Sequence, residues 1–433
     1  MADDATGPEA PTRRDTIKYG GAVIAGGLLA GCTGNSSPGS VATPEATGPE
    51  APADTEAATP TPTDADAATD AATETGTPED TSYSVTMSPV GEVTFDSVPS
   101  NVMAYSPQYA DMLVALGRDD ALNSLGFPDS YGTTLQYFFD HLDGVDFETG
   151  GLTQLFSNGS FDKEILYELD SDVHLMDPAW LSAFDNWSKA DTEEIRENVG
   201  PWFANRYSRE HTQPPAGWRE SYRYYTIWEI TEKVSQVFGE PARYEALKDE
   251  YEKLYGHVRA NLPPENERPT VGLVAFWDGK FSPYKTSGPG FGKAHTRPLG
   301  ARDAFADSDR TYDENYEAAY DFEGMLEIDP DVILHNFAVT PFYDWSEITE
   351  TVTNDPVGRE LTAVKDDRFY ASGQSFQGPL QNLLQIEMTA KQLYPEQFGE
   401  WPRFEEGDSY PDFDEEEQLF DHRRVADIVD GAV

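Results

Sequence analysis

Two patterns of apolar residues alternate along the central part of the chain. Short uncharged runs such as "NVMAYSP" (101–107) and "TVGLVAFW" (270–277) have the length and composition of buried strands. The segments 109–116 and 241–262 instead place apolar residues three or four positions apart, which is typical of helices with one buried face. Strands that alternate with helices predict an α/β fold with mostly parallel sheets, in which ligand-contacting loops follow the carboxyl ends of the strands.

The longest predicted helix separates two such regions. Segment 241–262 starts at Pro241, which suits the first helical position after Gly239 has ended the preceding helical segment. About 21 residues with a rise of about 1.5 Å each make a rod of roughly 30 Å. A rigid helix of this length can join two lobes that lie side by side.

An internal repeat supports two similar lobes. "FDKEILYELDSDVHLMD" (161–177) aligns without a gap to "YDFEGMLEIDPDVILHN" (320–336), and seven of 17 positions are identical. The identical pairs are Asp162/Asp321, Glu164/Glu323, Glu168/Glu327, Asp170/Asp329, Asp172/Asp331, Val173/Val332 and Leu175/Leu334. Each copy predicts a short amphipathic helix, a turn and a buried strand.

We therefore expect six regions along the chain. They are a signal segment (1–31), a tether (32–82), a first α/β lobe (83–225), linker helices (226–262), a second α/β lobe (263–400) and an acidic tail (401–433). The tail ends in "LFDHRRVADIV", which predicts a helix packed on one of the lobes.

The first 32 residues have the order of an export signal. Arg13 and Arg14 precede an uncharged run from Tyr19 to Gly31, which is too short for a membrane-spanning helix of about 20 residues. The arginine pair resembles a twin-arginine signal, and "LAGC" resembles a lipobox in which Cys32 is lipidated and becomes the mature N-terminus. The alternative is a buried cysteine in an ordinary helix, but no helix-length amphipathic pattern surrounds Cys32.

The segment that follows Cys32 predicts a flexible tether. Residues 33–82 contain no aromatic residue, no Lys and no Arg, so they cannot bury enough apolar surface to offset the entropy of ordering. A flexible coil of about 50 residues averages roughly 40 Å end to end. Such a tether would hold a globular body near a membrane.

The formal net charge is −49, with 79 acidic and 30 basic residues. Nucleic-acid binding depends on Lys and Arg that neutralise phosphates, so this balance argues against a nucleic-acid partner. A carboxylate-rich and lysine-poor surface is typical of proteins from halophiles. Against this background, segments that contain bases and no acids stand out.

Two such basic segments occur, at 200–209 and 279–302. Both are rich in Gly, Pro and aromatic residues, which predicts loops, and loops of this composition suit an anionic and partly apolar ligand. The alternative is a loop that only pairs with neighbouring acidic surface. The glycine-rich "SGPGFGKA" is not a phosphate-binding P-loop, because Ser287 and Ala294 stand where that motif requires Gly and Ser or Thr. The candidate ligand contacts are Tyr109, Trp180, Trp202, Arg206, Trp277, Tyr284, Lys293 and Arg297.

Several further segments occur in a recognisable order: "VPSNVMAYSPQYADMLVALG", "RPTVGLVAFW" and "DPVGRELTAVKDDRFYASG", with both copies of the repeat and the long helix, span roughly residues 90–397. Together these segments resemble the class III solute-binding proteins of ABC importers for iron–siderophores, haem and cobalamin, here in a haloarchaeal, lipid-anchored form. The resemblance implies two α/β lobes joined by one rigid helix, with the ligand between them and no cofactor. It further implies that Glu164 and Glu323, one on each lobe, dock on arginines of a dimeric permease.

These observations predict a monomeric binding protein on the outer face of the cell membrane that captures a ferric siderophore, haem or a corrinoid. Neither HExxH nor GxSxG is present, so no enzymatic motif supports catalysis. Two alternatives stay open. One is a free metal-ion receptor that uses His211, His295 and His335, and the other is an anchored enzyme on a chelatase-like or nitrogenase-like two-lobed fold.

Overall fold

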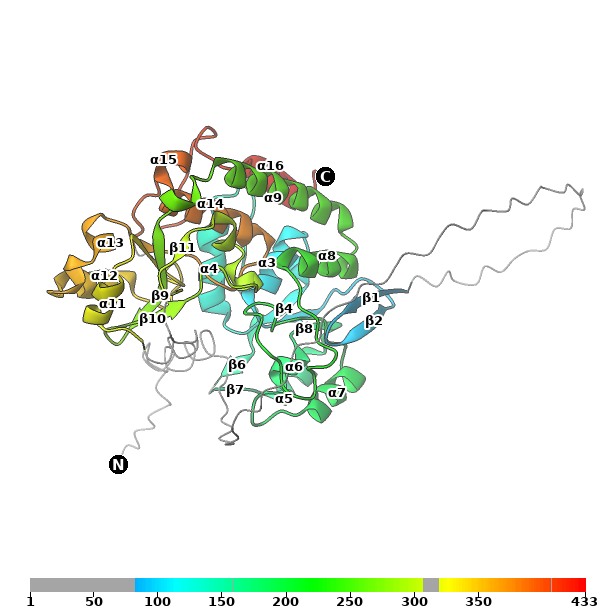
Figure 1. Ribbon diagram of the computed structural model, residues 1–433. Coiled ribbons are helices and arrows are strands. Elements are labelled where there is room, and N and C mark those ends of the chain that lie inside the picture. Colours follow the sequence, from blue (N-terminus) through cyan, green and yellow to red (C-terminus); the bar gives the residue numbers. More distant parts are fainter. Residues whose placement is uncertain (1–81, 158, 307–318, 406) are drawn as a thin grey trace, which may run out of the picture.

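The computed structural model describes residues 82–157, 159–306, 319–405 and 407–433, which form two α/β lobes (Figure 1). The predicted signal segment, Cys32 and nearly all of the predicted tether lie outside these residues. Each lobe is built on its own sheet, and the α/β class with mostly parallel strands is confirmed.

The first lobe contains a parallel sheet in the order β5-β4-β3-β8. Its strands are β3 (Val102–Ala104), β4 (Leu122–Leu125), β5 (Thr153–Gln154) and β8 (Val173–Leu175). The helices around it are α3 (Pro107–Ala115), α4 (Pro128–Phe139), α5 (Lys163–Leu169), α6 (Pro178–Leu181) and α7 (Lys189–Asn198). Two antiparallel pairs complete the lobe: β1 (Tyr83–Met87) with β2 (Gly91–Phe95), and β6 (Phe156–Ser157) with β7 (Ser160–Phe161).

The second lobe has the strand order β10-β9-β12-β13, with β11 beside the start of β9. Its strands are β9 (Thr270–Trp277), β10 (Lys280–Tyr284), β11 (Arg302–Asp303), β12 (Val332–His335) and β13 (Phe369–Ala371). The helices are α11 (Phe322–Ile328), α12 (Trp345–Asn354), α13 (Thr362–Lys365), α14 (Pro379–Leu393) and α15 (Pro395–Phe398). The loop expected at the start of the second basic segment is instead strand β10, which pairs antiparallel with β9 and buries Phe281 opposite Phe276.

The two copies of the repeat fold alike, and the structure explains most of the identical residues. Asp162 and Asp321 accept a backbone hydrogen bond at the start of α5 and α11, and Asp170 and Asp329 end these helices with φ of 46° and 43°. Asp can occupy this left-handed region more easily than most residues. The valine and leucine pairs lie in the buried strands β8 and β12. The repeat therefore predicted local structure correctly.

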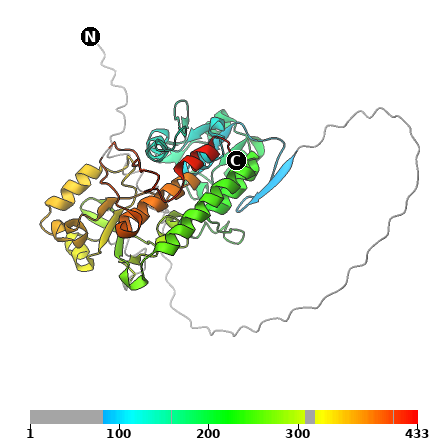
Figure 2. The same cartoon turned by 90° about the horizontal axis from the view of Figure 1, so that it is seen from above.

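Helices α8 (Ile227–Phe238) and α9 (Pro241–Asn261) connect the lobes, as the sequence predicts. Gly239 has a φ of 69° at the end of α8, and Pro241 opens α9. Figure 2 shows α9 running beside α14 and α16 (His422–Val429). The predicted helix in the tail is thus present and packs against the linker.

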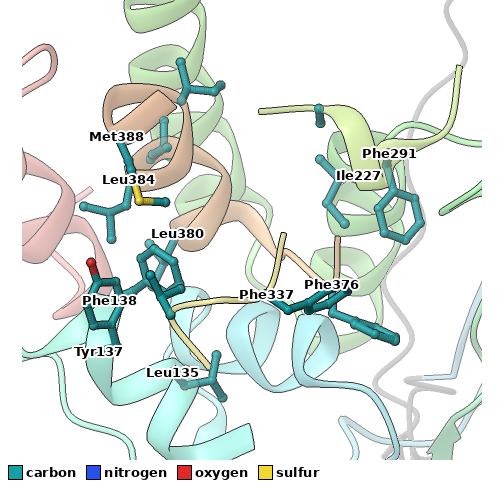
Figure 3. Packing of buried hydrophobic residues seen from close by; sticks show 14 of the residues in the cluster. Leu135, Tyr137, Phe138, Ile227, Phe291, Phe337, Phe376, Leu380, Leu384 and Met388 are labelled. Atoms are coloured by element: carbon teal, nitrogen blue, oxygen red, sulfur yellow. The ribbon is translucent and has the colours of Figure 1, made fainter. Parts of the chain in front are cut away.

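Helix α14 forms the centre of the core, because all 15 of its residues are buried. In Figure 3, Leu380, Leu384 and Met388 of α14 lie near Phe138 of α4 in the first lobe. Replacing a buried leucine of this kind by alanine typically costs about 2–5 kcal/mol. The packing of α14 on first-lobe helices therefore holds the two lobes together.

Helix α14 is also capped from the other lobe. The carboxylate of Asp111, on α3, accepts hydrogen bonds from the backbone N–H groups of Leu380 (3.0 Å) and Gln381 (2.9 Å). A Cβ at Gly378 would lie 2.5 Å from Cγ of Asp111, so only glycine leaves room for this carboxylate. Because Asp111 is fully buried, desolvation raises its pKa to about 7.

Candidate functional site

The candidate site lies where the carboxyl ends of both parallel sheets face each other. Tyr105 directly follows β3, and Trp180 lies on α6, which follows β8 after two residues. Phe337 and Phe376 follow β12 and β13 in the second lobe. Ligands of open α/β sheets bind at this end of the strands, which makes the boundary between the lobes the expected binding region.

Aromatic rings from the two lobes meet at this boundary. The ring of Tyr131, on α4, lies 6.2 Å from that of Phe342 and 6.4 Å from that of Phe376, measured between centroids. Phe127 lies 6.3 Å from Phe342. The rings are tilted or edge-on to one another, which is the favoured geometry for aromatic pairs.

Two arginines of the first basic segment lie over these rings. The guanidinium carbon of Arg206 is 4.0 Å from the centroid of the Trp180 ring and 5.5 Å from that of Phe376. The guanidinium carbon of Arg209 is 3.8 Å from the centroid of Phe376. Arg206 and Arg209 are only 9% and 6% exposed. Both cations are therefore held between the lobes by stacking on aromatic faces.

A third cation reaches the same place from the second lobe. Lys293 is 4% exposed, and its Nζ lies 3.4 Å from Oγ of Ser375 and 5.1 Å from the centroid of the Tyr284 ring. Glu210 lies within 3.9 Å of Lys293 and 3.4 Å of Arg209. Burial alone would raise the pKa of Glu210, but the positive charges of Lys293, Arg209 and Arg206 hold it below its usual range. One carboxylate thus faces three cations.

The two basic segments are joined through their backbones. The N–H of Phe291 donates to the carbonyl oxygen of Ser208 at 3.1 Å, and the N–H of Gly292 donates to that of Arg209 at 2.8 Å. A Cβ at Gly290 would lie 2.0 Å from the Arg209 carbonyl oxygen. The glycines of "SGPGFGKA" therefore permit a close backbone approach, and segments about eighty positions apart form a single loop cluster.

Asp177 fixes the first-lobe part of this cluster. Its carboxylate accepts hydrogen bonds from the N–H of Ala179 at the start of α6 and from the N–H of Arg206, both at 2.8 Å. The hydroxyl of Tyr222 donates to the same carboxylate. Burial raises the pKa of Asp177 to about 6. Asp177 thereby fixes the start of α6, which carries Trp180, relative to the backbone of Arg206.

One buried donor of the cluster lacks an acceptor: Nη1 of Arg209 makes no hydrogen bond with any described residue. Burial and the neighbouring charge of Arg206 lower the pKa of Arg209 to about 10, and burial raises that of Tyr105, whose hydroxyl interacts with that of Tyr131, to about 12. A buried donor without an acceptor is unfavourable, so this guanidinium is suited to an anionic ligand.

A comparison with protein families identifies the scaffold. Residues 102–375, more than half of the chain, match the model of the periplasmic binding protein family. The chain belongs to this family. Its members are solute-binding proteins that act outside the cytoplasm, and the class III fold with two α/β lobes is the one seen in this structure. In the part of the chain that the structure describes, no helix has the length and hydropathy needed to cross a membrane.

Several solved structures were matched to this chain at low sequence identity. The iron uptake ABC transporter substrate-binding protein PiuA from Streptococcus pneumoniae is 17% identical with a TM-score of 0.49, and the match covers 70% of this chain and 96% of PiuA. The siderophore-binding protein BauB, solved with two acinetobactin molecules and ferric iron, is 15% identical with a TM-score of 0.49, covering 72% and 98%. An ABC-type Fe³⁺-hydroxamate transport protein from Saccharomonospora viridis is 18% identical, covering 69% and 95%, with a TM-score of 0.43. No curated protein matches this chain in sequence.

For this periplasmic binding protein, the structure gathers four of the eight candidate ligand contacts into the loop cluster. Trp180 lies against Arg206, and Tyr284 lies against Lys293. The two pairs come from different lobes and are linked through the backbone contacts between the basic segments.

The other four candidates have different surroundings. The hydroxyl of Tyr109 accepts a hydrogen bond from the N–H of Asn205, and the indole of Trp202 donates to the carbonyl of Thr192 within the core. Nη1 of Arg297 donates to the carbonyls of Gly288 and Gly290, so this side chain supports the basic loop. Trp277 is 56% exposed at the turn between β9 and β10.

The alternative metal site is not assembled. His335 accepts a hydrogen bond from the N–H of Phe276, His295 bonds with Gln377, and His211 stacks on Tyr224. Among the described residues, no three His, Cys, Asp or Glu side chains gather as metal ligands would. The hypothesis of a centre formed by His211, His295 and His335 is therefore wrong.

Sequence reasoning did not select Arg209, Tyr105, Tyr131 or Phe376. Arg209 lay in a recognised basic segment, and Tyr105 lay inside the run 101–107 predicted as a strand, whereas no strand was predicted ahead of Phe376, which follows β13. Tyr131 lies on α4, in a segment whose helical pattern the sequence analysis did not use.

Proposed function

We propose that this protein captures an anionic ferric chelate between its two lobes and delivers it to an ABC importer. The observation that carries this proposal is the set of three buried cations, Arg206, Arg209 and Lys293, stacked on aromatic rings at the boundary of the lobes. Membership in a family of solute-binding proteins supports a binding role without catalysis.

The chemistry of these side chains favours one class of ligand. Guanidinium groups form forked hydrogen bonds with carboxylate and catecholate oxygens, and aromatic faces accept flat or apolar ligand parts. A ferric catecholate, a ferric carboxylate siderophore or haem offers both negative charge and apolar surface. A neutral hydroxamate complex would add no negative charge to that of Glu210, so the three cations would stay in excess of the one carboxylate, and buried excess charge is unfavourable.

Delivery would depend on parts of the chain outside the binding region. Glu164 and Glu323 are exposed on the equivalent helices α5 and α11, as docking on a two-fold permease requires. Lipidation of Cys32 and export by the signal containing Arg13 and Arg14 would place the protein on the outer face of the membrane. The acidic composition agrees with a cell that lives in high salt.

Titration monitored by intrinsic tryptophan fluorescence tests which class of chelate the protein binds. We expect saturable quenching by ferric tris-catechol, ferric citrate or haem, and weaker quenching by a neutral ferric hydroxamate. Lys293→Gln should weaken binding of the anionic chelates at least about tenfold, whereas Lys280→Gln, an exposed lysine of the same basic segment, should not. Quenching by free metal ions without any response to these chelates would refute the proposal.

A further inference from the structure

A chain of titratable side chains joins the C-terminal tail to both lobes. His422, the first residue of α16, contacts His141, which follows α4, through Nδ1 of His422 and Nε2 of His141. The other ring nitrogen of His422 lies 3.0 Å from Oε2 of Glu387 on α14. The hydroxyl of Tyr410 donates to the same oxygen at 2.7 Å, and the N–H of Leu419 donates to Oε1 at 2.6 Å.

These groups are shielded from water. The side chains of His141 and His422 are each 5% exposed, and that of Glu387 is fully buried. Burial alone would raise the pKa of Glu387, but its hydrogen bond and charge interaction with His422 hold the pKa below the usual range. Glu387 is therefore an ionised carboxylate, and the N–H at Nε2 of His422 donates a hydrogen bond to it.

The contact between the two imidazoles can hold only one proton. Nδ1 of His422 faces Nε2 of His141, so one of these nitrogens donates and the other must accept. Burial, together with the charge of His422, lowers the pKa of His141. A second proton would place two N–H groups against each other and would break the contact.

The charged groups around the two histidines do not offer His141 a better hydrogen-bond acceptor than His422. The groups that face it among the described residues are Asp143, Asp412, Lys391 and Glu417. Asp412 lies 3.9 Å from Nδ1 of His141, but its side chain is fully exposed to solvent. Nζ of Lys391 already donates hydrogen bonds to the carbonyl oxygens of Phe398 (2.8 Å) and Glu417 (2.7 Å).

We propose that His141, His422 and Glu387 form a proton-sensitive latch for the C-terminal tail. At neutral pH the latch holds residues 410–429 against α4 and α14. When both imidazoles are protonated, two N–H groups face each other, the contact between His141 and His422 breaks, and the tail is released. Because α4 carries Tyr131 and α14 begins three residues after Phe376, the latch connects proton concentration to two helices next to the binding region.

Hydrogen–deuterium exchange of the full chain, corrected for the intrinsic exchange rate, tests the latch. Between about pH 7.5 and about pH 5, within the titration range of histidine, protection of residues 410–429 should fall at least about tenfold relative to α9. In His141→Gln the fall should be absent, because a glutamine amide can either donate to or accept from His422. His257→Gln, which changes an exposed histidine on α9, should behave as wild type.

Unchanged protection in the wild type over this range would refute the latch, and so would an equal loss of protection in His141→Gln. If His141→Gln does not fold, His422→Gln provides the same test from the other side of the contact. Circular dichroism at both pH values should show that the rest of the protein stays folded.

Discussion

The N–H of Gly292 donates a hydrogen bond of 2.8 Å to the carbonyl oxygen of Arg209. This bond joins two basic segments that are far apart in the sequence and belong to different lobes. It brings Arg209 to one oxygen and Lys293 to the other oxygen of the same carboxylate, that of Glu210. The cationic character of the site thus depends on a backbone contact between the lobes.

Gly290→Ala should disrupt this contact. The added Cβ would lie 2.0 Å from the carbonyl oxygen of Arg209, so one of the two basic segments would have to move away from the other. We expect a loss of about 2–3 kcal/mol in the free energy of unfolding and at least a tenfold loss of ligand affinity. Gly256→Ala on α9, where a Cβ meets nothing within 4 Å, is the control and should not destabilise. An unchanged affinity in Gly290→Ala would show that the two segments bind independently.

Arg209→Met should separate binding from stability. Removing a buried guanidinium whose Nη1 lacks an acceptor should leave the free energy of unfolding unchanged or raise it by about 1 kcal/mol. Affinity for ferric tris-catechol should fall at least tenfold, or about 1.4 kcal/mol. Denaturant unfolding and fluorescence titration measure the two quantities. A large loss of stability would mean that Arg209 is structural; Arg196→Met, at an exposed site, is the reference.

Charge reversal of Glu164 and Glu323 should abolish transport without affecting ligand capture. Both residues are exposed, and neither makes an ion pair with a described residue, so Glu164→Lys with Glu323→Lys should leave the fold intact. Uptake of radioactive ferric chelate by cells, compared with fluorescence titration of the purified variant, separates the two effects. A fall in affinity would disprove the docking assignment. Glu193→Lys with Glu347→Lys supplies a control of equal charge.

Acid should destabilise the protein partly through His335. Nε2 of this histidine accepts a hydrogen bond from the N–H of Phe276, and burial lowers its pKa to about 4. Because the folded pKa lies below the unfolded value of about 6.5, its contribution to stability is present above about pH 6.5 and is lost as the pH falls toward 4.

Denaturant unfolding at several pH values measures this effect. The dependence on pH should be shallower in His335→Gln than in wild type, by up to about 1.4 kcal/mol per pH unit. The raised pKa of Asp111 acts in the opposite direction in both proteins, so the difference between them isolates His335. Parallel curves would show that a charged His335 is tolerated.

Cys32→Ser should release the protein from the membrane. Cys32 is the only cysteine in the chain and ends the lipobox-like sequence, so its thiol is the expected attachment point. Fractionation of cells should find the wild type with the membrane and the variant in the medium, with equal ligand affinity. Retention of the variant in the membrane fraction would argue for another anchor.

The sequence by itself determined the repeated helix–strand units, the long linker helix and the arrangement in two lobes, but not strand β10 or helix α4. The repeated Asp residues cap equivalent helices and the valine and leucine pairs enter equivalent strands, because caps, left-handed turns and buried runs depend on neighbouring residues alone. Pro241 and the spacing after it likewise predicted α9. The family resemblance extended this local pattern to the correct fold.

Only the tertiary structure decided which side chains share the site. Arg206 and Arg297 are both bases in glycine-rich and aromatic-rich segments, yet one stacks on Trp180 and the other bonds to loop carbonyls. Trp180 and Trp202 also look alike in sequence, but their rings lie at the lobe boundary and in the core respectively. Such differences depend on contacts between residues distant in the chain, and local sequence carries no information about those contacts. The close approach of Gly290 to the backbone of Arg209 brings the two basic segments together, and this approach requires both lobes to be folded.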